Sequence, residues 1–413
     1  MISKEAIKEA VENLRRKIND KAYKNRSKCT TKAFTRASKL GFVKTILLKL
    51  NFAKRSGAVE VYKFFREVAV EEPVSRQAYE KSRNQISHTA FSELFDDSVK
   101  IALSVEDAKL HKGYRILPID GTTLRLDKSE SLKERFGKST PHKGEVYARI
   151  SICTDILNGT ILDGSIEGFN VGERRMAIRH IEKDLCENAL YLADRGYYSF
   201  EIVDKIISSG RKFLIRLASN SIAELARSEQ DSGFVEVRHK SKAYKLRYYK
   251  FQLKSGEMEY LLTNLDEAEF SDEDLKELYA MRWGIETKYN EMKNQMLLES
   301  FTGKSELVVM QDFYATLYMM NLVAFSIMAA ESEIPEKERK YEYKINKNTT
   351  IGMLKNNLIR TVTEEDPKRS NAMIDKLMKD ISRCIVPIRP GRYNKRKKTD
   401  MKRRKKIGLK SAF

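Results

Sequence analysis

The sequence predicts an α/β protein in which a mixed β-sheet is covered by helices on both faces. From Tyr114 onward, strand patterns alternate with helical patterns, the order typical of a sheet with helical connections. Asn158-Gly159, a dipeptide that favours tight hairpin turns, joins two of the strand patterns. The chain has 413 residues, of which 41% are hydrophobic. This is enough for about two to four domains and a large buried core.

Residues 1–105 are expected to form a helical DNA-binding region. Apolar residues recur at helical spacing from Val43 to Glu67, and a second helix is predicted within 73–86. This second helix is either a recognition helix or an ordinary solvated one. Its side chains that are able to reach phosphates or base edges are Arg76, Gln77, Lys81, Arg83 and Asn84.

The elements that follow are predicted to form the core. The predicted order is a strand, a two-stranded hairpin, a helix, a strand, a helix and a strand. In that order, their residues are 114–126, 148–168, 173–185, 188–199, 199–210 and 212–217. The first strand is expected to end near Asp120, and the strand within 188–199 is expected to end at Asp194.

The second half of the core is predicted to be interrupted. Alternating strand patterns make 218–265 a β-rich insertion, and Ser271 with the acids after it starts a helix over 271–296. Eighteen uncharged residues from Phe313 to Ala330 approach transmembrane length, but a buried core helix is the better interpretation, so no membrane partner is expected. The expected regions are 1–105, a catalytic core of 106–217 and 266–335, the insertion at 218–265, a helical region at 336–390 and a basic tail at 391–413.

The charge distribution indicates a polyanionic partner. The net charge is +20, with +12 in residues 1–56 and +10 in residues 391–413, so the rest of the chain is nearly neutral. Basic ends on a neutral body fit arms that grip nucleic acid or an anionic membrane; the alternative is that they only maintain solubility or bind RNA nonspecifically. The four cysteines are scattered, which excludes a disulfide scaffold and points to a reducing compartment.

Two acidic residues stand after apolar strand patterns. Asp120 and Asp194 are each followed by a glycine-containing turn sequence. Open sheets present their functional side chains at the carboxyl ends of strands. An Asp-Gly pair alone is more often only a turn, so the interpretation depends on a third acid.

That third acid belongs to a row on the predicted 271–296 helix. At 100° per residue, four side chains project within about 60° of one another beside an apolar stripe: Tyr279, Arg282, Glu286 and Lys293. A surface ion pair between Arg282 and Glu286 is the alternative, but it does not explain the other two.

This residue set suits metal-assisted phosphoryl transfer. Carboxylates from separate elements can hold two Mg²⁺ ions about 3.5–4 Å apart, where one activates the attacking water or 3′-hydroxyl and the other stabilises the leaving oxygen. Asp120, Asp194 and Glu286 are sufficient because Mg²⁺ keeps several waters. Arg282 and Lys293 are candidates to clamp phosphates.

Other candidates are open to two interpretations. Tyr279 is expected to stack or to donate to a phosphate. Trp283, the only tryptophan, either stacks on an unpaired base or packs inside the protein. His142 and His180 are expected to be structural rather than metal ligands.

The spacing Y-x2-R-x3-E-x6-K from Tyr279 to Lys293 resembles the Y-R-E-K signature of DDE-type insertion-sequence transposases, in particular those with a β-rich insertion in the core. The sequences IDGT at Asp120 and ADRGY at Asp194 are similar to that family too, as is the segment 385–398. The resemblance covers about residues 100–400 and implies a ribonuclease-H-like fold.

The resemblance also implies roles for the site residues. Asp120, Asp194 and Glu286 would be the catalytic, metal-binding triad for two Mg²⁺ ions, with Mn²⁺ as a substitute. The residues that would contact DNA are Tyr279, Arg282, Lys293 and Trp283.

The activity implied is that of a transposase. It would bind the ends of an insertion sequence, cleave to expose 3′-hydroxyls and join them to target DNA, as a homodimer in the synaptic complex. Such a protein is expected in the cytoplasm, associated with the nucleoid. The alternatives are a noncatalytic DNA-binding protein on a degenerate core and a ribonuclease-H-like nuclease that does not join strands.

Overall fold

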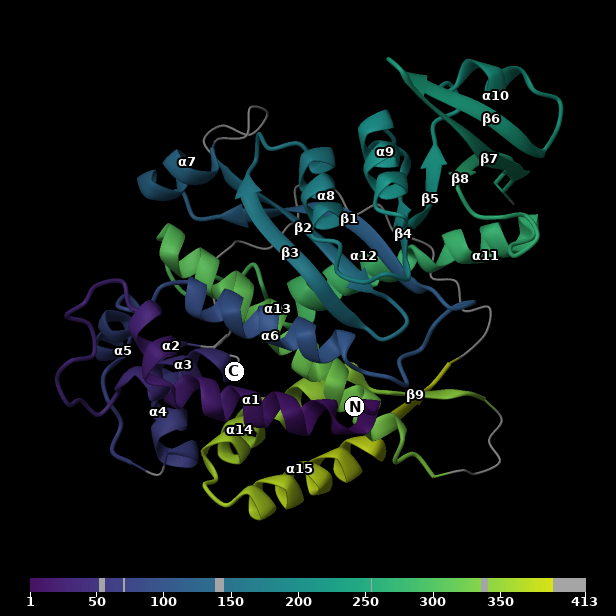
Figure 1. Cartoon of the computed structure of the whole chain (residues 1–413). Helices are drawn as coiled ribbons and strands as arrows, with labels where there is room; N and C mark the ends of the chain where they lie inside the picture. Colours follow the sequence, from purple (N-terminus) through teal and green to yellow (C-terminus); the bar gives the residue numbers. More distant parts are fainter. Residues whose placement is uncertain (52–55, 70, 138–144, 254, 336–340, 389–413) are drawn as a thin grey trace.

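The computed structural model describes residues 1–51, 56–69, 71–137, 145–253, 255–335 and 341–388. At its centre is one eight-stranded sheet in the order β3-β2-β1-β4-β5-β8-β7-β6 (Figure 1). The strands are β1 (Arg115–Leu126), β2 (Val146–Asp155), β3 (Thr160–Gly168), β4 (Ala189–Ala193), β5 (Lys212–Leu217), β6 (Ser232–His239), β7 (Lys242–Gln252) and β8 (Met258–Thr263).

The sheet is mixed, as the sequence predicts. Strands β1, β4 and β5 run parallel, whereas β2 and β3 form an antiparallel hairpin beside β1. This arrangement agrees with the ribonuclease-H-like class. The predicted turn at Asn158-Gly159 is confirmed, and Gly159 has a φ of 70°, which a glycine adopts without a steric penalty.

Helices cover both faces of the sheet (Figure 1). On one face, α8 (Glu173–Glu182) packs on β1 and β2, and α9 (Phe200–Ser208) packs on β5. On the other face, α6 (Thr89–Leu103) and α13 (Glu306–Glu331) pack on β3, and α12 (Trp283–Asn290) packs on β1. The helical covering predicted from the alternation is therefore confirmed.

Helix α13 is the central helix of the protein. Within the described residues it is the one helix long and apolar enough to cross a membrane, but 83% of its most apolar window is buried. It contacts the sheet through β3 and also contacts α6, α1 (Ala6–Asn19) and α15 (Pro367–Ser382). The predicted buried core helix is confirmed.

The strand-rich segment before the signature helix extends the main sheet. Strand β8 pairs antiparallel with β5, placing Leu214 opposite Thr263, and β7 and β6 follow outward. The strand patterns predicted within 218–265 are confirmed. A short helix, α10 (Ala223–Arg227), precedes them.

The two ends of the chain form a helical layer next to α13 (Figure 1). The helical segment predicted from Val43 to Glu67 contains two separate helices, α3 and α4. The basic tail 391–413 lies outside the described residues. The remaining elements are α2 (Lys21–Arg26), α3 (Phe42–Leu50), α4 (Gly57–Lys63), α5 (Arg76–Arg83), α7 (Glu130–Phe136), β9 (Tyr343–Ile345), α14 (Lys347–Thr363) and β10 (Ile385–Pro387).

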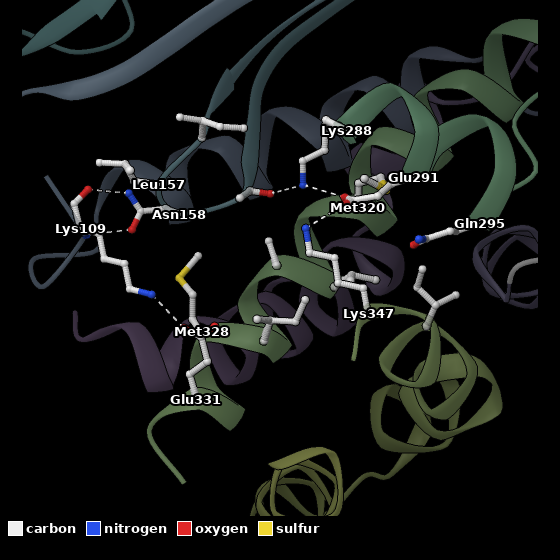
Figure 2. Close-up of a pocket in the computed structure, with 16 residues that line it drawn as sticks. Lys109, Leu157, Asn158, Lys288, Glu291, Gln295, Met320, Met328, Glu331 and Lys347 are labelled. Carbon is white, nitrogen blue, oxygen red and sulfur yellow. Dashed lines mark hydrogen bonds and ion pairs between the residues drawn. The ribbon is translucent and has the colours of Figure 1, made fainter. Parts of the chain in front are cut away.

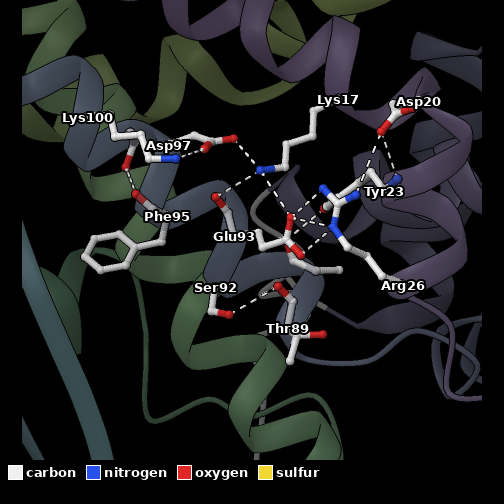
Figure 3. A network of polar contacts seen from close by, with 12 residues as sticks. Lys17, Asp20, Tyr23, Arg26, Thr89, Ser92, Glu93, Phe95, Asp97 and Lys100 are labelled. Atoms are coloured by element: carbon white, nitrogen blue, oxygen red, sulfur yellow. Dashed lines mark hydrogen bonds and ion pairs between the residues drawn. The ribbon is translucent and has the colours of Figure 1, made fainter.

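Part of the N-terminal positive charge is paired inside the protein. Arg26 lies 2.8 Å from Glu93, and Lys17 forms ion pairs with Glu93 and Asp97 on α6 (Figure 3). The hydroxyl of Tyr23 donates to the carbonyl of Ala90, 2.8 Å away, and the ring is fully buried. These contacts fasten α1 and α2 to α6, so these basic side chains are not a free arm.

One predicted DNA-contact residue is in the core instead. Arg83, at the end of α5, is buried, and its guanidinium donates to Gln311 and Asp312 of α13. Lys49 forms a second buried ion pair with Asp312. Arg83 is therefore not able to reach a phosphate or a base edge here, because its guanidinium is held against α13.

Candidate active site

Two of the three predicted acids stand at one edge of the sheet. Strands β1 and β4 pair in parallel as far as Pro118 opposite Leu192, and Asp120 and Asp194 each lie two residues further on. Asp194 directly follows β4, as predicted. Burial is the main cause that raises the pKa of Asp120, and the negative charge of Asp194 adds to it.

The surroundings of Asp120 differ from the prediction. Strand β1 continues to Leu126, and Gly121 is paired with Ser151 of β2 rather than forming a turn. The reason is that β2 takes over as the partner of β1 where β4 stops. The predicted strand end at Asp120 is therefore wrong, although Asp120 still lies at the same level of the sheet as Asp194.

The signature segment is not one straight helix. It divides into α11 (Asp272–Met281), α12 and a π-helical turn over Glu291–Gln295. At the junction, the backbone N–H groups of Arg282 and Ile285 bond to carbonyls three residues back. The predicted start is confirmed, because Ser271 and Asp274 form a capping box. The backbone of Arg282 stays in the right-handed helical region, so the chain passes from α11 into α12 through one tightened turn.

Arg282 lies at the junction, between the carboxylates. Its side chain is 6% exposed and lies 3.6 Å from Glu286. Its Nε atom is buried without a hydrogen-bond partner among the described residues. Burial acts to lower the pKa of Arg282, but the negative groups around it, among them Asp194 and Asp120, raise it overall. The guanidinium is thus paired with Glu286 and is also influenced by the charges of Asp194 and Asp120.

The two aromatic residues of the signature flank Arg282. The guanidinium stands 5.5 Å from the ring of Tyr279 and 5.8 Å from that of Trp283. The Tyr279 hydroxyl is 3.5 Å from Oδ1 of Asp194, and burial raises its pKa to about 12. Trp283 is 57% exposed, so it is not a packed aromatic.

Lys293 contacts the strand that carries Asp120. Its Nζ donates to the Thr122 hydroxyl and to the Thr123 carbonyl, both at 2.8 Å, and lies 3.9 Å from Glu299. The signature lysine therefore contacts β1 two and three residues after Asp120.

The donor set fits a hard divalent cation. Burial raises the pKa of Asp120 to about 6, and in the described part of the chain no lysine or arginine forms an ion pair with it. Its carboxylate accepts from the Gly121 N–H at 2.8 Å. In the same residues, no three His, Cys, Asp or Glu side chains are grouped closely enough to hold a metal ion as they stand. Carboxylate oxygens are the ligands that Mg²⁺ takes.

Comparison with known proteins decides the family. A family model described as the transposase DDE domain matches residues 111–322, just over half of the chain, and this span includes Asp120, Asp194 and Glu286. The chain belongs to the DDE transposase family. Divalent metals are general in that family.

The chain is similar to transposase InsG for insertion sequence element IS4 of Escherichia coli (strain K12). The two are 22% identical over 273 residues, which is 62% of this chain and 62% of the relative, so the match spans less than two thirds of that protein. A solved structure of piggyBac transposase, in a synaptic complex with hairpin DNA, gives a TM-score of 0.47 at 12% identity and covers 94% of this chain and 86% of that chain.

Two residues next to Asp194 were not predicted from the sequence. Arg216, near the carboxyl end of β5, lies 3.9 Å from Asp194 and 2.9 Å from Glu259 of β8. Burial raises the pKa of Glu259. The position of Arg216 at a strand end was a usable signal, but the pairing of β8 with β5 was not visible in the sequence.

The histidine candidates were expected to be structural. His180 is buried and contacts Asp163 and Ser151, which confirms the structural interpretation. His142 lies outside the described residues. A cavity of about 160 Å³ opens behind α12 (Figure 2), where the charges of Lys288 and Lys347 are paired with Glu291. None of the three predicted acids lines this cavity.

Proposed function

We propose that the chain is a DNA transposase that cleaves the ends of an insertion sequence and joins the freed 3′-hydroxyls to target DNA. The observation that carries this proposal is the position of Asp120 and Asp194 at the ends of the paired stretches of β1 and β4, with Glu286 brought in by a helix packed on β1. The match to the DDE domain over the same residues supports it.

The proposed metal ligands are Asp120, Asp194 and Glu286, for two Mg²⁺ ions or for Mn²⁺ in their place. The ions would activate the attacking oxygen and neutralise the leaving one. Without metal ions, Arg282 supplies a positive charge that pairs with Glu286 and acts on Asp194 and Asp120. With divalent ions bound to the acids, its guanidinium is available to a DNA phosphate.

The other signature residues are proposed to hold DNA. Lys293 bonds to Thr122 and Thr123 and would present its charge to a phosphate that passes β1 near Asp120. Tyr279 is buried beside Asp194 and would orient its carboxylate. The exposed ring of Trp283 provides a face for an unpaired base next to the cleavage site.

The proposed partners are double-stranded DNA, as transposon ends and as target, and a second copy of the chain. The two ends of an element have to be brought together before joining, so a homodimer is expected in the synaptic complex. The net charge of +20 favours binding to DNA and an association with the nucleoid in the cytoplasm.

Incubation of the purified chain with DNA carrying the element's ends tests the proposal. Mg²⁺ should produce cut ends, EDTA should abolish them, and added target DNA should give joined strands. Cut ends that never join would favour the nuclease alternative. DNA binding without cutting, with either Mg²⁺ or Mn²⁺ present, would favour the noncatalytic alternative.

A further inference from the structure

A tyrosine of α12 touches the backbone of Asp120. The Tyr289 hydroxyl donates to the Asp120 carbonyl at 2.5 Å and accepts from the Ile152 N–H at 3.2 Å. Asp120 and Ile152 face each other across β1 and β2. The Tyr289 ring is 7% exposed, so this hydroxyl is deep in the protein and joins one helix to two strands at the point where the first acid stands.

The same carbonyl has a second hydroxyl donor. Ser151 of β2 donates to the Asp120 carbonyl at 3.1 Å, and its Oγ lies 2.9 Å from Nε2 of His180. Nδ1 of His180 is 2.6 Å from Asp163. The series resembles a hydrolytic triad, but Ser151 is fully buried and faces a backbone carbonyl, so it supports the strand rather than acting as a nucleophile.

Tyr289 differs from Ser151 because it belongs to the element that carries Glu286. The two residues are three positions apart, about one helical turn, and α12 packs on β1. The residue before Tyr289, Lys288, donates to the Gly159 carbonyl in the β2–β3 turn at 2.8 Å (Figure 2). Lys293 then bonds to Thr122 and Thr123. These contacts fix the distance between α12 and the strands on which it packs.

We infer that Tyr289 is a positioning residue, whose hydroxyl sets the distance between the Asp120 and Glu286 carboxylates and thereby the affinity of the site for divalent ions. This inference rests on the proposed function. Contacts of this kind fix the orientation of the groups that bind a metal, and their loss typically costs about 10–100-fold in metal affinity or activity.

Tyr289→Phe tests the inference, because it keeps the buried ring and removes only the hydroxyl. The matched control is Tyr23→Phe, which removes another buried hydroxyl that donates to a backbone carbonyl, far from the site. Two quantities are measured for each protein with DNA bound: the affinity for Mn²⁺ by electron paramagnetic resonance, and the Mg²⁺ concentration that gives half-maximal cleavage.

Tyr289→Phe should weaken Mn²⁺ binding and raise the Mg²⁺ requirement by about 10–100-fold, with unchanged DNA affinity and partial recovery at high metal concentration. Tyr23→Phe should match the wild type within about twofold. Equal metal affinity in Tyr289→Phe and the wild type, or an equal loss in Tyr23→Phe, would overturn this inference and leave the proposed function standing.

A wild type that neither binds Mn²⁺ nor cuts DNA would overturn the proposed function and this inference with it. Should Tyr289→Phe fail to fold by circular dichroism, Lys288→Met removes another contact that holds α12 against the strands, the bond to the Gly159 carbonyl. It should also raise the Mg²⁺ requirement; an unchanged requirement in that variant would overturn the inference.

Discussion

Gly284 lies directly against Ile156, so that a Cβ atom at position 284 would overlap Cγ1 and Cδ1 of the isoleucine. Gly284 is the second residue of α12, and Ile156 follows β2 in the hairpin turn. The absence of a side chain at 284 therefore lets the signature segment approach the sheet at the junction where Arg282 stands.

Gly284→Ala should lower the free energy of unfolding by about 1–3 kcal/mol through this overlap. Urea unfolding measures the change. The control is Gly352→Ala in α14, where nothing lies within 4 Å of an added Cβ and a gain of up to about 1 kcal/mol is expected from helix propensity. The double variant Gly284→Ala, Ile156→Ala should recover part of the loss; no recovery would mean that the overlap is not the cause.

Asp312→Ala should destabilise the protein far more than an ordinary surface charge deletion. Asp312 forms ion pairs with both Lys49 and Arg83 in the core. Its removal takes away the negative charge that these two buried cations share. Loss of one partner of a buried pair costs about 3–5 kcal/mol. Asp380→Ala, which removes an exposed partner of Arg383, should cost less than about 1 kcal/mol. Similar losses in the two variants, measured by urea unfolding, would contradict the buried network.

The metal-free protein should lose stability with rising pH because of Asp120. Burial raises the pKa of Asp120 from the ordinary 3.8 to about 6. The folded state therefore prefers the protonated acid: its contribution is complete below about pH 4 and is lost as the pH rises through about 6. The shift corresponds to about 3 kcal/mol.

Urea unfolding in EDTA across this pH range, for the wild type and Asp120→Asn, isolates that contribution. The stability of the wild type relative to Asp120→Asn should fall between about pH 4 and pH 7. A stability difference between the two proteins that stays constant with pH would show that burial does not raise the pKa of Asp120.

Trp283→Ala should weaken DNA binding and leave folding unchanged. The ring is 57% exposed, so its removal opens no cavity. Stacking of a base on an aromatic ring is worth about 1–3 kcal/mol. The affinity for end DNA with an unpaired base near the cleavage site should fall accordingly in Trp283→Ala, and Trp283→Phe should keep most of it. Equal affinity for Trp283→Ala and the wild type would exclude the stacking role.

Local patterns predicted much of the fold. The strand 212–217, the hairpin at Asn158-Gly159 and the helix start at Ser271 are all found in the structure, because each depends on residues close in sequence. Asp194 was located by the apolar strand before it. The buried α13 followed from its uncharged length together with its few polar residues.

Contacts distant in sequence were beyond these patterns. The continuation of β1 past Asp120 depends on β2 as a partner. The close approach of Gly284 to Ile156 joins a helix to a hairpin turn that lies far from it in sequence. The ring of Tyr289 is buried like that of an apolar residue, whereas its hydroxyl reaches a carbonyl 169 residues away in sequence. A helical projection shows the direction of a side chain but not the polar group that it meets.

Strand cleavage by Asp194→Asn, at DNA concentrations that saturate binding, tests the proposed catalytic site most directly. The substitution keeps the size of the side chain and removes its charge, so DNA should still bind while the cleavage rate falls by at least about 1,000-fold, or about 4 kcal/mol in the barrier. Glu187→Gln, an exposed acid ahead of β4, should cut at the wild-type rate. Normal cutting by Asp194→Asn would contradict the assignment of the three acids.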